Sequence, residues 1–380
     1  MLSDYMGILS LNEKEDNIEN LTKNRLIASI PIAGRYRVVD FVLSNMVNSG
    51  ITNLGVFTQS KSRSLIDHIG SGKPWDLDRK IDGLFIFNYG ESNTTLSDIE
   101  MIKNNIEYLY RSKKNMIVIS CSSMVCNIDY ESAARFHEDS GKDITIIYKK
   151  VKVSNKCFRD CNILNITKDN LVSGVGKNVR LFTPNSNDDL PRESTVDLSM
   201  DMFILSKSTL INLLNNCIKT GYSSDFRNCI YNNIMNLEVN AYEFKGHLSY
   251  INSIQSYYKA NMDILNLEVS NDLFFANGVI YTKVMDEPPT KYFSTSDVSN
   301  SLIANGCLIK GTVKSSVISR RVYIEEGAII NNCIIMQGCK IKSNAKLNNM
   351  IVDKNNVIEE NVELKGTVDF PLVLEKRSLY

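Results

Sequence analysis

The length, composition and charge of the chain exclude several classes of protein. It has 380 residues, enough for two or three domains with buried cores. Its 43 basic and 43 acidic side chains cancel without a long basic tract, so we expect no nucleic-acid partner. No apolar run reaches the length of a membrane span and the first residues lack a signal-peptide pattern, so we expect a cytoplasmic protein that does not bind membranes.

The nine cysteines and three histidines form no recognisable reactive site. The cysteines are scattered singly, without a C-x-x-C pair, and we predict that they are reduced and mostly buried thiols. The histidines, His68, His137 and His247, lie on separate segments, which argues against a zinc site or a Ser/His/Asp triad. Neither residue type therefore predicts a catalytic centre.

Residues 1–255 alternate between strand-like and helix-like stretches. The segments 116–121 and 144–149 are apolar runs with the length of buried strands, and 97–110 has the apolar spacing of a helix. This rhythm predicts an α/β domain with a mixed, mostly parallel sheet covered by helices.

Residues 256–296 link this domain to the rest of the chain. A helix is predicted from Ile254 to Leu267. The stretch from Leu273 to Thr295 contains Pro288 and Pro289, which fix the backbone and remove hydrogen-bond donors. It is therefore predicted to be an extended connector.

Large apolar residues recur at every sixth position near the C-terminus. A period of six fits neither a helix nor a simple strand, but is typical of short strands and turns wound into a triangular coil. It predicts a β-solenoid over residues 297–380, with about four coils of about eighteen residues each. An open solenoid end is usually covered, so we predict an oligomer, most simply a tetramer. The residues that carry the period are Val317, Tyr323, Ile329, Ile335, Ile341 and Leu347 and, after a one-residue slip, Val352, Ile358 and Leu364.

A long segment near the N-terminus resembles a known signature. Residues 34–45, with Arg25 before them and 48–51 after them, resemble the GGxYRIIDFxLSNxxNSGI signature of ADP-glucose pyrophosphorylases. Further motifs follow in the family's order, which implies its fold: a Rossmann-like nucleotidyltransferase domain followed by a left-handed β-helix of hexapeptide repeats. These motifs are 199–203 (similar to SMGIY), 225–226 (HDFG), 257–263 (YWKANLDL) and 288–292 (PPAKF).

The chain departs from this family in the loop that binds the nucleotide. Active members begin with GGxGTRLxPLT, in which glycine amides and an arginine approach a triphosphate. The corresponding residues 11–18 contain no glycine and no arginine, but three carboxylates, Glu13, Glu15 and Asp16. ATP binding in the family's manner is therefore not expected.

Three further positions of the family's catalytic site are degenerate. Counted from neighbouring motifs, the two aspartates that hold Mg²⁺ in the family correspond to Ser123 and Tyr250, and the lysine of the RAKP segment to Ile27. A hydroxyl and a phenol do not replace two anionic ligands of a hard cation. The resemblance thus implies no catalytic residue, metal or cofactor in this chain, and Mg²⁺ only in a catalytic partner.

This combination resembles the GlgD-type subunit of heteromeric bacterial ADP-glucose pyrophosphorylases. The resemblance implies a non-catalytic regulatory subunit in glycogen synthesis, assembled with a catalytic GlgC-type subunit or with itself as a tetramer. One alternative is an active sugar-1-phosphate nucleotidyltransferase with a relocated metal site, for which Asp40, Asp129 and Asp225 remain. Others are a hexapeptide acyltransferase, although no histidine follows His247, and a scaffold without a ligand.

Four basic residues are candidate binding residues. By resemblance, Arg35, Arg37 and Arg320 correspond to positions that bind a phosphorylated metabolite effector, and arginine suits this role because its planar fork binds phosphate in a bidentate manner. Lys177 matches the lysine of the family's EKP segment, which contacts the sugar phosphate. The alternatives are ordinary surface or ion-paired arginines and a solvated lysine.

Overall fold

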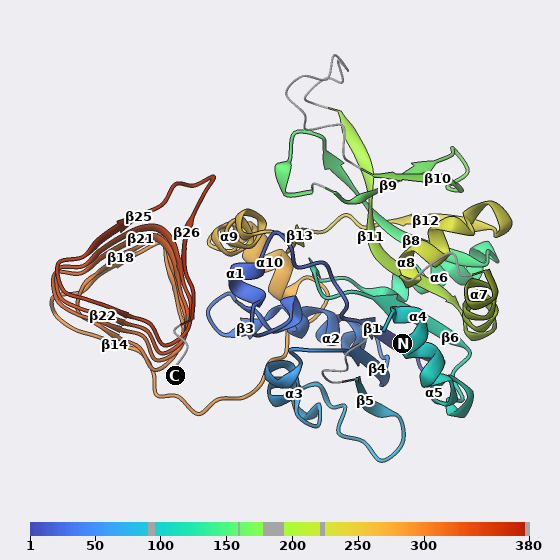
Figure 1. Cartoon of the computed structure of the whole chain (residues 1–380), viewed down its shortest axis with the longest axis horizontal. Helices are drawn as coiled ribbons and strands as arrows, with labels where there is room; N and C mark the ends of the chain where they lie inside the picture. The colour runs from blue at the N-terminus through green and yellow to red at the C-terminus, as the bar shows by residue number, and fades with distance from the viewer. Residues whose placement is uncertain (90–95, 159, 178–193, 221–224, 377–380) are drawn as a thin grey trace.

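Two structural units lie side by side and are joined by an extended segment (Figure 1). The computed structural model describes residues 1–89, 96–158, 160–177, 194–220 and 225–376. The first unit is an α/β domain and the second a triangular coil of short strands. The predicted fold class, a nucleotidyltransferase domain followed by a left-handed β-helix, is confirmed.

The α/β domain is built on a nine-stranded sheet in the part of the chain that the structure describes. Its order is β10-β9-β11-β6-β1-β4-β5, and β8 pairs with both β11 and β12. β1 pairs in parallel with β4 and β6, whereas β11 runs antiparallel to β6, so the sheet is mixed as predicted. The strands are β1 (Tyr5–Ser10), β4 (Asn53–Thr58), β5 (Gly83–Asn88), β6 (Met116–Ser120), β8 (Ile144–Lys152), β9 (Asn162–Ile166), β10 (Val172–Lys177), β11 (Thr195–Ser206) and β12 (Val239–Glu243).

Helices cover both faces of this sheet because successive strand residues point to opposite sides. In β1, Met6 and Ile8 belong to one hydrophobic cluster and Leu9 to the other. One face packs against α2 (Val38–Asn48), α3 (Arg63–Ile69) and α6 (Tyr130–Ser140), and the other against α4 (Asp98–Asn104), α5 (Ile106–Arg111), α7 (Lys207–Thr220) and α8 (Phe226–Asn232).

The predicted helix over 97–110 is divided into α4 and α5. Ser97 begins α4 with a capping box, in which its side chain and that of Glu100 each accept from the other's backbone N–H. The break falls at Asn105, whose side-chain amide donates to the carbonyl of Met101 at 2.9 Å. Asparagine side chains compete in this way with the helical hydrogen bonds, which explains the interruption.

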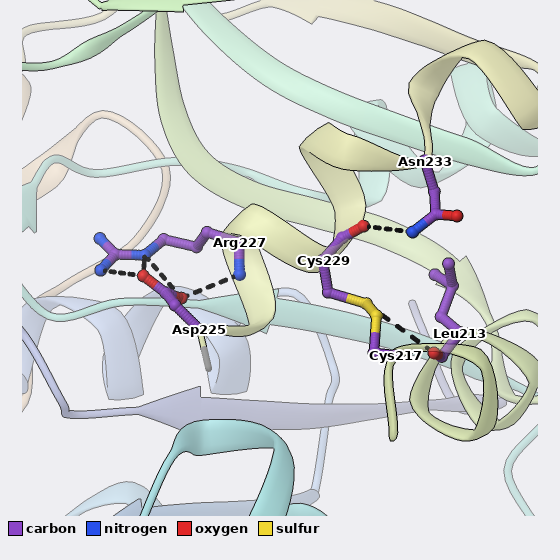
Figure 2. The surroundings of a disulfide bond; sticks show 6 residues. All are labelled: Leu213, Cys217, Asp225, Arg227, Cys229 and Asn233. Atoms are coloured by element: carbon purple, nitrogen blue, oxygen red, sulfur yellow. Dashed lines mark hydrogen bonds and ion pairs between the residues drawn. A yellow bond between two sulfur atoms is a disulfide. The ribbon is translucent and has the colours of Figure 1, made fainter. Parts of the chain in front are cut away.

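A disulfide joins Cys217 of α7 to Cys229 of α8 (Figure 2). The prediction that all cysteines are reduced is therefore wrong for these two. They are twelve residues apart in sequence, so no short-spacing motif announces the pair, and the packing of α7 against α8 brings their Cα atoms to 6.4 Å. The other seven cysteines are free, and all of them except Cys157 are buried.

The linking region contains two helices where one was predicted. α9 (Ile254–Asp263) ends before Asn266, whose side chain accepts from the backbone N–H of Glu268 and begins α10 (Leu267–Phe275). Helix thus continues past Leu273, the predicted start of the connector. Residues 279–290 then run without regular secondary structure to β14 (Lys291–Tyr292), which pairs with a strand of the coil.

Most paired strands of the coil are seventeen residues apart, and one coil is shortened to fifteen, whereas eighteen was predicted. Leu302 pairs with Val317, and Val317 with Ile334. Its strands are β15 (Asp297–Ser299), β16 (Leu302–Ile303), β17 (Leu308–Ile309), β18 (Thr312–Lys314), β19 (Val317–Ile318), β20 (Tyr323–Ile324), β21 (Ile329–Ile335), β22 (Lys340–Ile341), β23 (Lys346–Val352), β24 (Val357–Ile358), β25 (Glu363–Lys365) and β26 (Leu372–Leu374).

The shorter coil shifts part of the predicted apolar stripe. Tyr323 and Ile329 are only half-buried, and their neighbours Ile324 and Ile330 fill the interior instead. A seventeen-residue coil accommodates steps of six, six and five. The step of five from Leu347 to Val352 is the predicted slip, whereas the earlier one, from Ile330 to Ile335, was missed.

A shared hydrophobic cluster fixes the coil against the α/β domain. Ile334, Met336 and Ile351 of the coil pack with α1 (Glu19–Thr22), α9 and α10. Tyr258 of α9 donates its hydroxyl to the carbonyl of Asn332 at 2.7 Å. Of the helices in the described ranges, none combines the length and apolarity needed to cross a bilayer.

Candidate functional site

The two positions predicted to correspond to the family's metal-binding aspartates are neighbours in the structure. Strand β7 (Met124–Val125) pairs with β13 (Ser249–Tyr250), and the carbonyl of Ser123 accepts from the N–H of Ile251 at 2.8 Å. Ser123 is buried, and burial raises the pKa of the Tyr250 phenol. Both groups therefore remain neutral, and this pair does not fit Mg²⁺, which prefers anionic oxygen ligands.

The position predicted to correspond to the family's lysine lies in the hydrophobic core. Ile27 begins a short 3₁₀ helix, η1 (Ile27–Ser29), and is 1 % exposed. It belongs to the cluster that joins the α/β domain to the coil. The side chain at this position thus contributes to packing and carries no charge toward the cleft.

The acidic N-terminal loop places its own carboxylate on the chain that carries Ser123. Oε1 of Glu13 accepts hydrogen bonds from the backbone N–H of Ser122 at 2.6 Å, from the Ser122 hydroxyl at 2.7 Å and from the backbone N–H of Ser123 at 2.9 Å. Backbone amides and hydroxyls that point to one place can bind an anion. Here the carboxylate of Glu13 occupies that place and accepts all three hydrogen bonds.

The pKa of Glu13 is raised overall. Burial raises it, and the hydrogen bonds from Ser122 and Ser123 and the charge of Arg227 offset part of that effect. Its second carboxylate oxygen is buried without a hydrogen-bond partner. Glu15 of the same loop pairs with Lys61 at 2.9 Å, and Asp16 is exposed. Of the three predicted carboxylates, only Glu13 enters the site.

An ion pair fills the region beside Glu13, and sequence reasoning missed it. Asp201 and Arg227 lie 3.2 Å apart, between Oδ2 and Nη1, and both are largely buried. Each stands where the family motifs quoted above, SMGIY and HDFG, have glycine. Relative to these motifs, an aspartate and an arginine that pair with each other replace two glycines. These two replacements are visible in the sequence and could have indicated the ion pair.

The backbone of Asp201 keeps the conformation that glycine favours. Its φ is +52°, in the left-handed region that aspartate rarely adopts, at an irregularity in β11 between Ser199 and Met202. Its carboxylate also accepts from the Tyr231 hydroxyl at 2.6 Å. Arg227 further binds Asp225 at 2.9 Å, and Figure 2 shows that pair at the start of the helix that carries Cys229.

Asp98 completes the buried charges of this site. Burial raises its pKa to about 6, and the charge of Asp225 adds to the effect. One of its carboxylate oxygens has no hydrogen-bond partner. It lines a cavity of about 20 Å³ together with Glu13, Asp201 and Arg227, which leaves room for one water molecule.

The three carboxylates considered for a relocated metal site are not brought together. Asp40 contacts Nε2 of His68 at 2.6 Å, Asp129 caps the N-terminus of α6, and Asp225 binds Arg227. Across the described residues, no three His, Cys, Asp or Glu side chains converge as a metal site would require.

Lys177 ends β10 with an exposed side chain. It pairs in register with Asn162, whose amide donates to Asp201 at 3.3 Å. Asn162 thus connects the strand position of the candidate sugar-phosphate lysine to the Asp201–Arg227 pair. The residues that follow it, 178–193, are outside the described part.

The three candidate effector arginines gather where the two units meet. Gly34 packs closely against the coil, because a Cβ atom added to it would lie 3.1 Å from the carbonyl oxygen of Ile318. Arg35 follows Gly34 and Arg320 follows Ile318 by two residues, so both arginines lie at this junction. Burial lowers the pKa of Arg320, and the positive charge of Arg35 lowers it further. Burial also lowers the pKa of Arg37 to about 10. Its guanidinium donates to the Ser64 hydroxyl at 2.9 Å.

Lys354 is a further basic residue at this junction that the sequence analysis did not identify. Burial lowers its pKa to about 7, and the charges of Arg37 and Arg25 act in the same direction. Arg25 itself is neutralised by Asp353 at 2.6 Å. The junction therefore holds more positive than negative charge, a condition that favours a bound anion. Lys354 follows an apolar stripe of the coil, and no local pattern distinguished it.

Comparisons with known proteins agree with this architecture. A nucleotidyl transferase family model matches residues 17–157, and a model of the GlmU-like C-terminal hexapeptide domain matches residues 288–367. The glycogen biosynthesis protein GlgD of Bacillus subtilis (strain 168) is 31% identical over 377 residues, which cover 98% of this chain and 96% of the relative.

Two further relatives are similar over most of their length. GlgD of Geobacillus stearothermophilus is 34% identical over 334 residues, covering 87% of this chain and 84% of the relative. A glucose-1-phosphate adenylyltransferase of Bacillus cereus (strain ATCC 14579) is 29% identical over 380 residues, covering 97% and 98%. The chain therefore belongs to the GlgD family, within the group of proteins related to ADP-glucose pyrophosphorylase.

Proposed function

We propose that this protein is a non-catalytic, regulatory subunit of glucose-1-phosphate adenylyltransferase and acts in glycogen biosynthesis. The observation that carries the proposal is the position of Glu13, whose carboxylate takes the amide donors of Ser122 and Ser123. A triphosphate would have to displace a carboxylate that is already bound. It would also find a serine and a tyrosine where the family places the ligands of Mg²⁺.

The proposed partner is a catalytic GlgC-type subunit, which alone holds Mg²⁺. The relatives named GlgD support the pathway, and the related adenylyltransferases support a partner of the same fold. Oligomers of related chains usually close by symmetry, and we propose a tetramer, mixed or homomeric, located in the cytoplasm.

Regulation in this proposal passes through the junction between the two units. Arg35 and Arg37 belong to the α/β domain and Arg320 to the coil, so one phosphorylated metabolite bound by all three would hold the two units in one arrangement. An effector shifts an equilibrium only by its difference in affinity for the two arrangements. The mixed assembly would pass that difference to the catalytic subunit.

The test is pyrophosphate release from ATP and glucose 1-phosphate with Mg²⁺, for this protein alone, the catalytic subunit alone and the two co-expressed. We expect no turnover by this protein alone and a changed rate or effector response in the mixture. Arg35→Ala and Arg320→Ala should remove the effector response without preventing assembly. Arg111→Ala is the matched control, because Arg111 is exposed on α5 and, among the residues that the structure describes, forms an ion pair only with Glu107.

Turnover by this chain alone would contradict the proposal and favour an active nucleotidyltransferase. An unchanged effector response in both arginine variants would leave the subunit role intact but show that the effector site is elsewhere.

A further inference from the structure

A wide groove runs between α9 and the corner of the coil. Its volume is about 1340 Å³, larger than a typical pocket for one small molecule. Gln255, Tyr258 and Met262 line it from one side, spaced along one face of α9 over about 10 Å, and Asn266 follows at the start of α10. Asn332 and its neighbours on the coil form the opposite side. The groove is therefore long enough for a chain molecule.

The lining of this groove is dominated by uncharged polar side chains. Of its twenty-two residues, six are asparagine, one is glutamine and four are serine. Of its five charged residues, Lys259 and Asp263 neutralise each other at 2.7 Å. The other three, Lys156, Asp160 and Asp369, leave no positive excess. The groove therefore does not attract a phosphorylated ligand, unlike the arginine-rich junction.

Several of these amides are free to bind a ligand. The side chains of Asn17, Gln255 and Asn332 have no hydrogen-bond partner among the described residues. A side-chain amide presents donors and an acceptor together, which matches a sugar hydroxyl that both donates and accepts. Three such groups on opposite sides of one groove suit a polyhydroxylated chain.

An exposed aromatic ring stands at the rim. Phe370 lies in the connection between β25 and β26, which projects from the coil on the side of α9 (Figure 1). Its side chain is 73% exposed, and Val368 beside it is 69% exposed. An exposed ring next to hydroxyl-binding groups provides the flat apolar surface on which the C–H face of a hexose ring stacks.

We propose that this groove binds an α-glucan, a neutral chain of glucose units. The uncharged amide lining, the exposed ring and the length of the groove together favour a linear oligosaccharide over a nucleotide, a metabolite anion or a folded partner. The relatives' role in glycogen biosynthesis makes the glucan the neutral polysaccharide that such a protein would meet. The inference does not depend on the regulatory role, because the groove is separate from the Glu13 and arginine sites.

The test is affinity electrophoresis of the full chain in native gels that contain glycogen, with calorimetry on maltoheptaose. We expect retardation by glycogen, a maltoheptaose affinity that salt does not change, and an affinity about tenfold weaker in Phe370→Ala and in Asn332→Ala. Tyr292→Ala is the matched control, since Tyr292 is an aromatic residue 52% exposed on β14 and outside the groove. It should bind like the unchanged protein.

Four results would overturn the inference. They are no binding of glycogen or maltoheptaose, equal binding by Phe370→Ala and the unchanged protein, binding that falls with salt and is exceeded by heparin, and a loss of oligomers in Phe370→Ala. The last would mean that a second copy of the chain covers the groove. Pyrophosphate release by the mixed enzyme, measured without glucan, should be the same for these variants, so failure here is distinct from failure of the subunit proposal.

Discussion

The guanidinium of Arg25 and the carboxylate of Asp353 lie 2.6 Å apart, with both side chains buried and 328 positions apart in sequence. Arg25 also donates from Nε to the carbonyl of Leu21 at 2.7 Å. This ion pair connects the α/β domain to the coil beside the arginine-rich junction. Removal of one partner leaves a buried charge unpaired, which is costly, whereas removal of both is often nearly neutral.

We therefore predict that Asp353→Asn lowers the free energy of unfolding by about 3–5 kcal/mol, and that Arg25→Met with Asp353→Leu costs less than either change alone. Urea denaturation measures both. Limited proteolysis should cut Asp353→Asn faster within residues 279–290, because the two units separate more often. Lys314→Ala removes an exposed pair with Asp297 and should change stability by less than about 1 kcal/mol. Equal effects of the buried and exposed changes would argue against this role of the pair.

The pair of Asp201 and Arg227 should behave as one unit. We predict that Arg227→Gly alone costs about 3–5 kcal/mol, because Asp201 then stays buried without its partner. The double change Asp201→Gly with Arg227→Gly should cost much less than the sum of the single changes, since it removes both charges and places glycine where φ is +52°. A double-mutant cycle in urea measures the coupling.

The exposed pair of Glu131 and Arg135, which lie 2.6 Å apart, is the control for that cycle and should couple by only about 0.5 kcal/mol. Additive effects of the Asp201 and Arg227 changes would show that the two residues do not support each other.

Asp98 should make stability depend on pH. Its pKa is raised by burial from 3.8 to about 6 in the folded chain, so between these values the folded state binds more protons than the unfolded state. Stability contributed by the protonated group is present at low pH and is lost as the pH rises to about 6. We predict that Asp98→Asn raises the free energy of unfolding by up to about 3 kcal/mol at pH 7 and has little effect near pH 4.

Thermal melting between pH 4 and pH 7.5 measures this difference. Glu100 provides a control of opposite sign, since its pKa is lowered by the hydrogen bonds from Ser97. Glu100→Gln should therefore reduce stability at pH 7 and have less effect as the pH falls. A gain in Asp98→Asn that is the same at every pH would point to packing instead of charge.

Periodicity predicted the coil well because its signal is local and repeated. Ile335, Ile341 and Leu347 are buried as predicted, and the error at Tyr323 and Ile329 came from the length of one coil. The helix breaks at Asn105 and Asn266 were not predicted, because a single side-chain hydrogen bond decides each of them.

The sequence predicted which catalytic groups of the family are missing from the candidate site, but not which contacts take their place. The replacements at Ser123, Tyr250 and Ile27 are visible in the sequence through the resemblance. The hydrogen bonds from the amides of Ser122 and Ser123 to Glu13 join residues more than a hundred positions apart. No local sequence pattern predicts such a contact. The same holds for the disulfide between α7 and α8.

Lys354 should make anion binding at the junction depend on pH. Burial lowers its pKa to about 7, so its ammonium is mostly charged at pH 6 and mostly neutral at pH 8. The nearby groups are Arg25, Arg37 and Lys376, which lower its pKa, and Asp353, which raises it. A bound anion favours the charged lysine. Affinity for an anion of fixed charge should therefore rise as the pH falls, by up to about tenfold between pH 8 and pH 6.

Sulfate is the suitable probe, because a phosphate ester gains charge over this pH range and would act in the opposite direction. Calorimetric titration with sulfate at pH 6, 7 and 8 measures the trend, and Lys354→Met should remove it while weakening binding at pH 6. Lys340→Met replaces an exposed lysine of β22 and should leave the trend unchanged. If sulfate binds Lys354→Met with the same pH dependence as the unchanged protein, the titrating group is not Lys354. The arginines, which stay charged at these pH values, could not supply the trend either, so the anion would have to bind outside the junction.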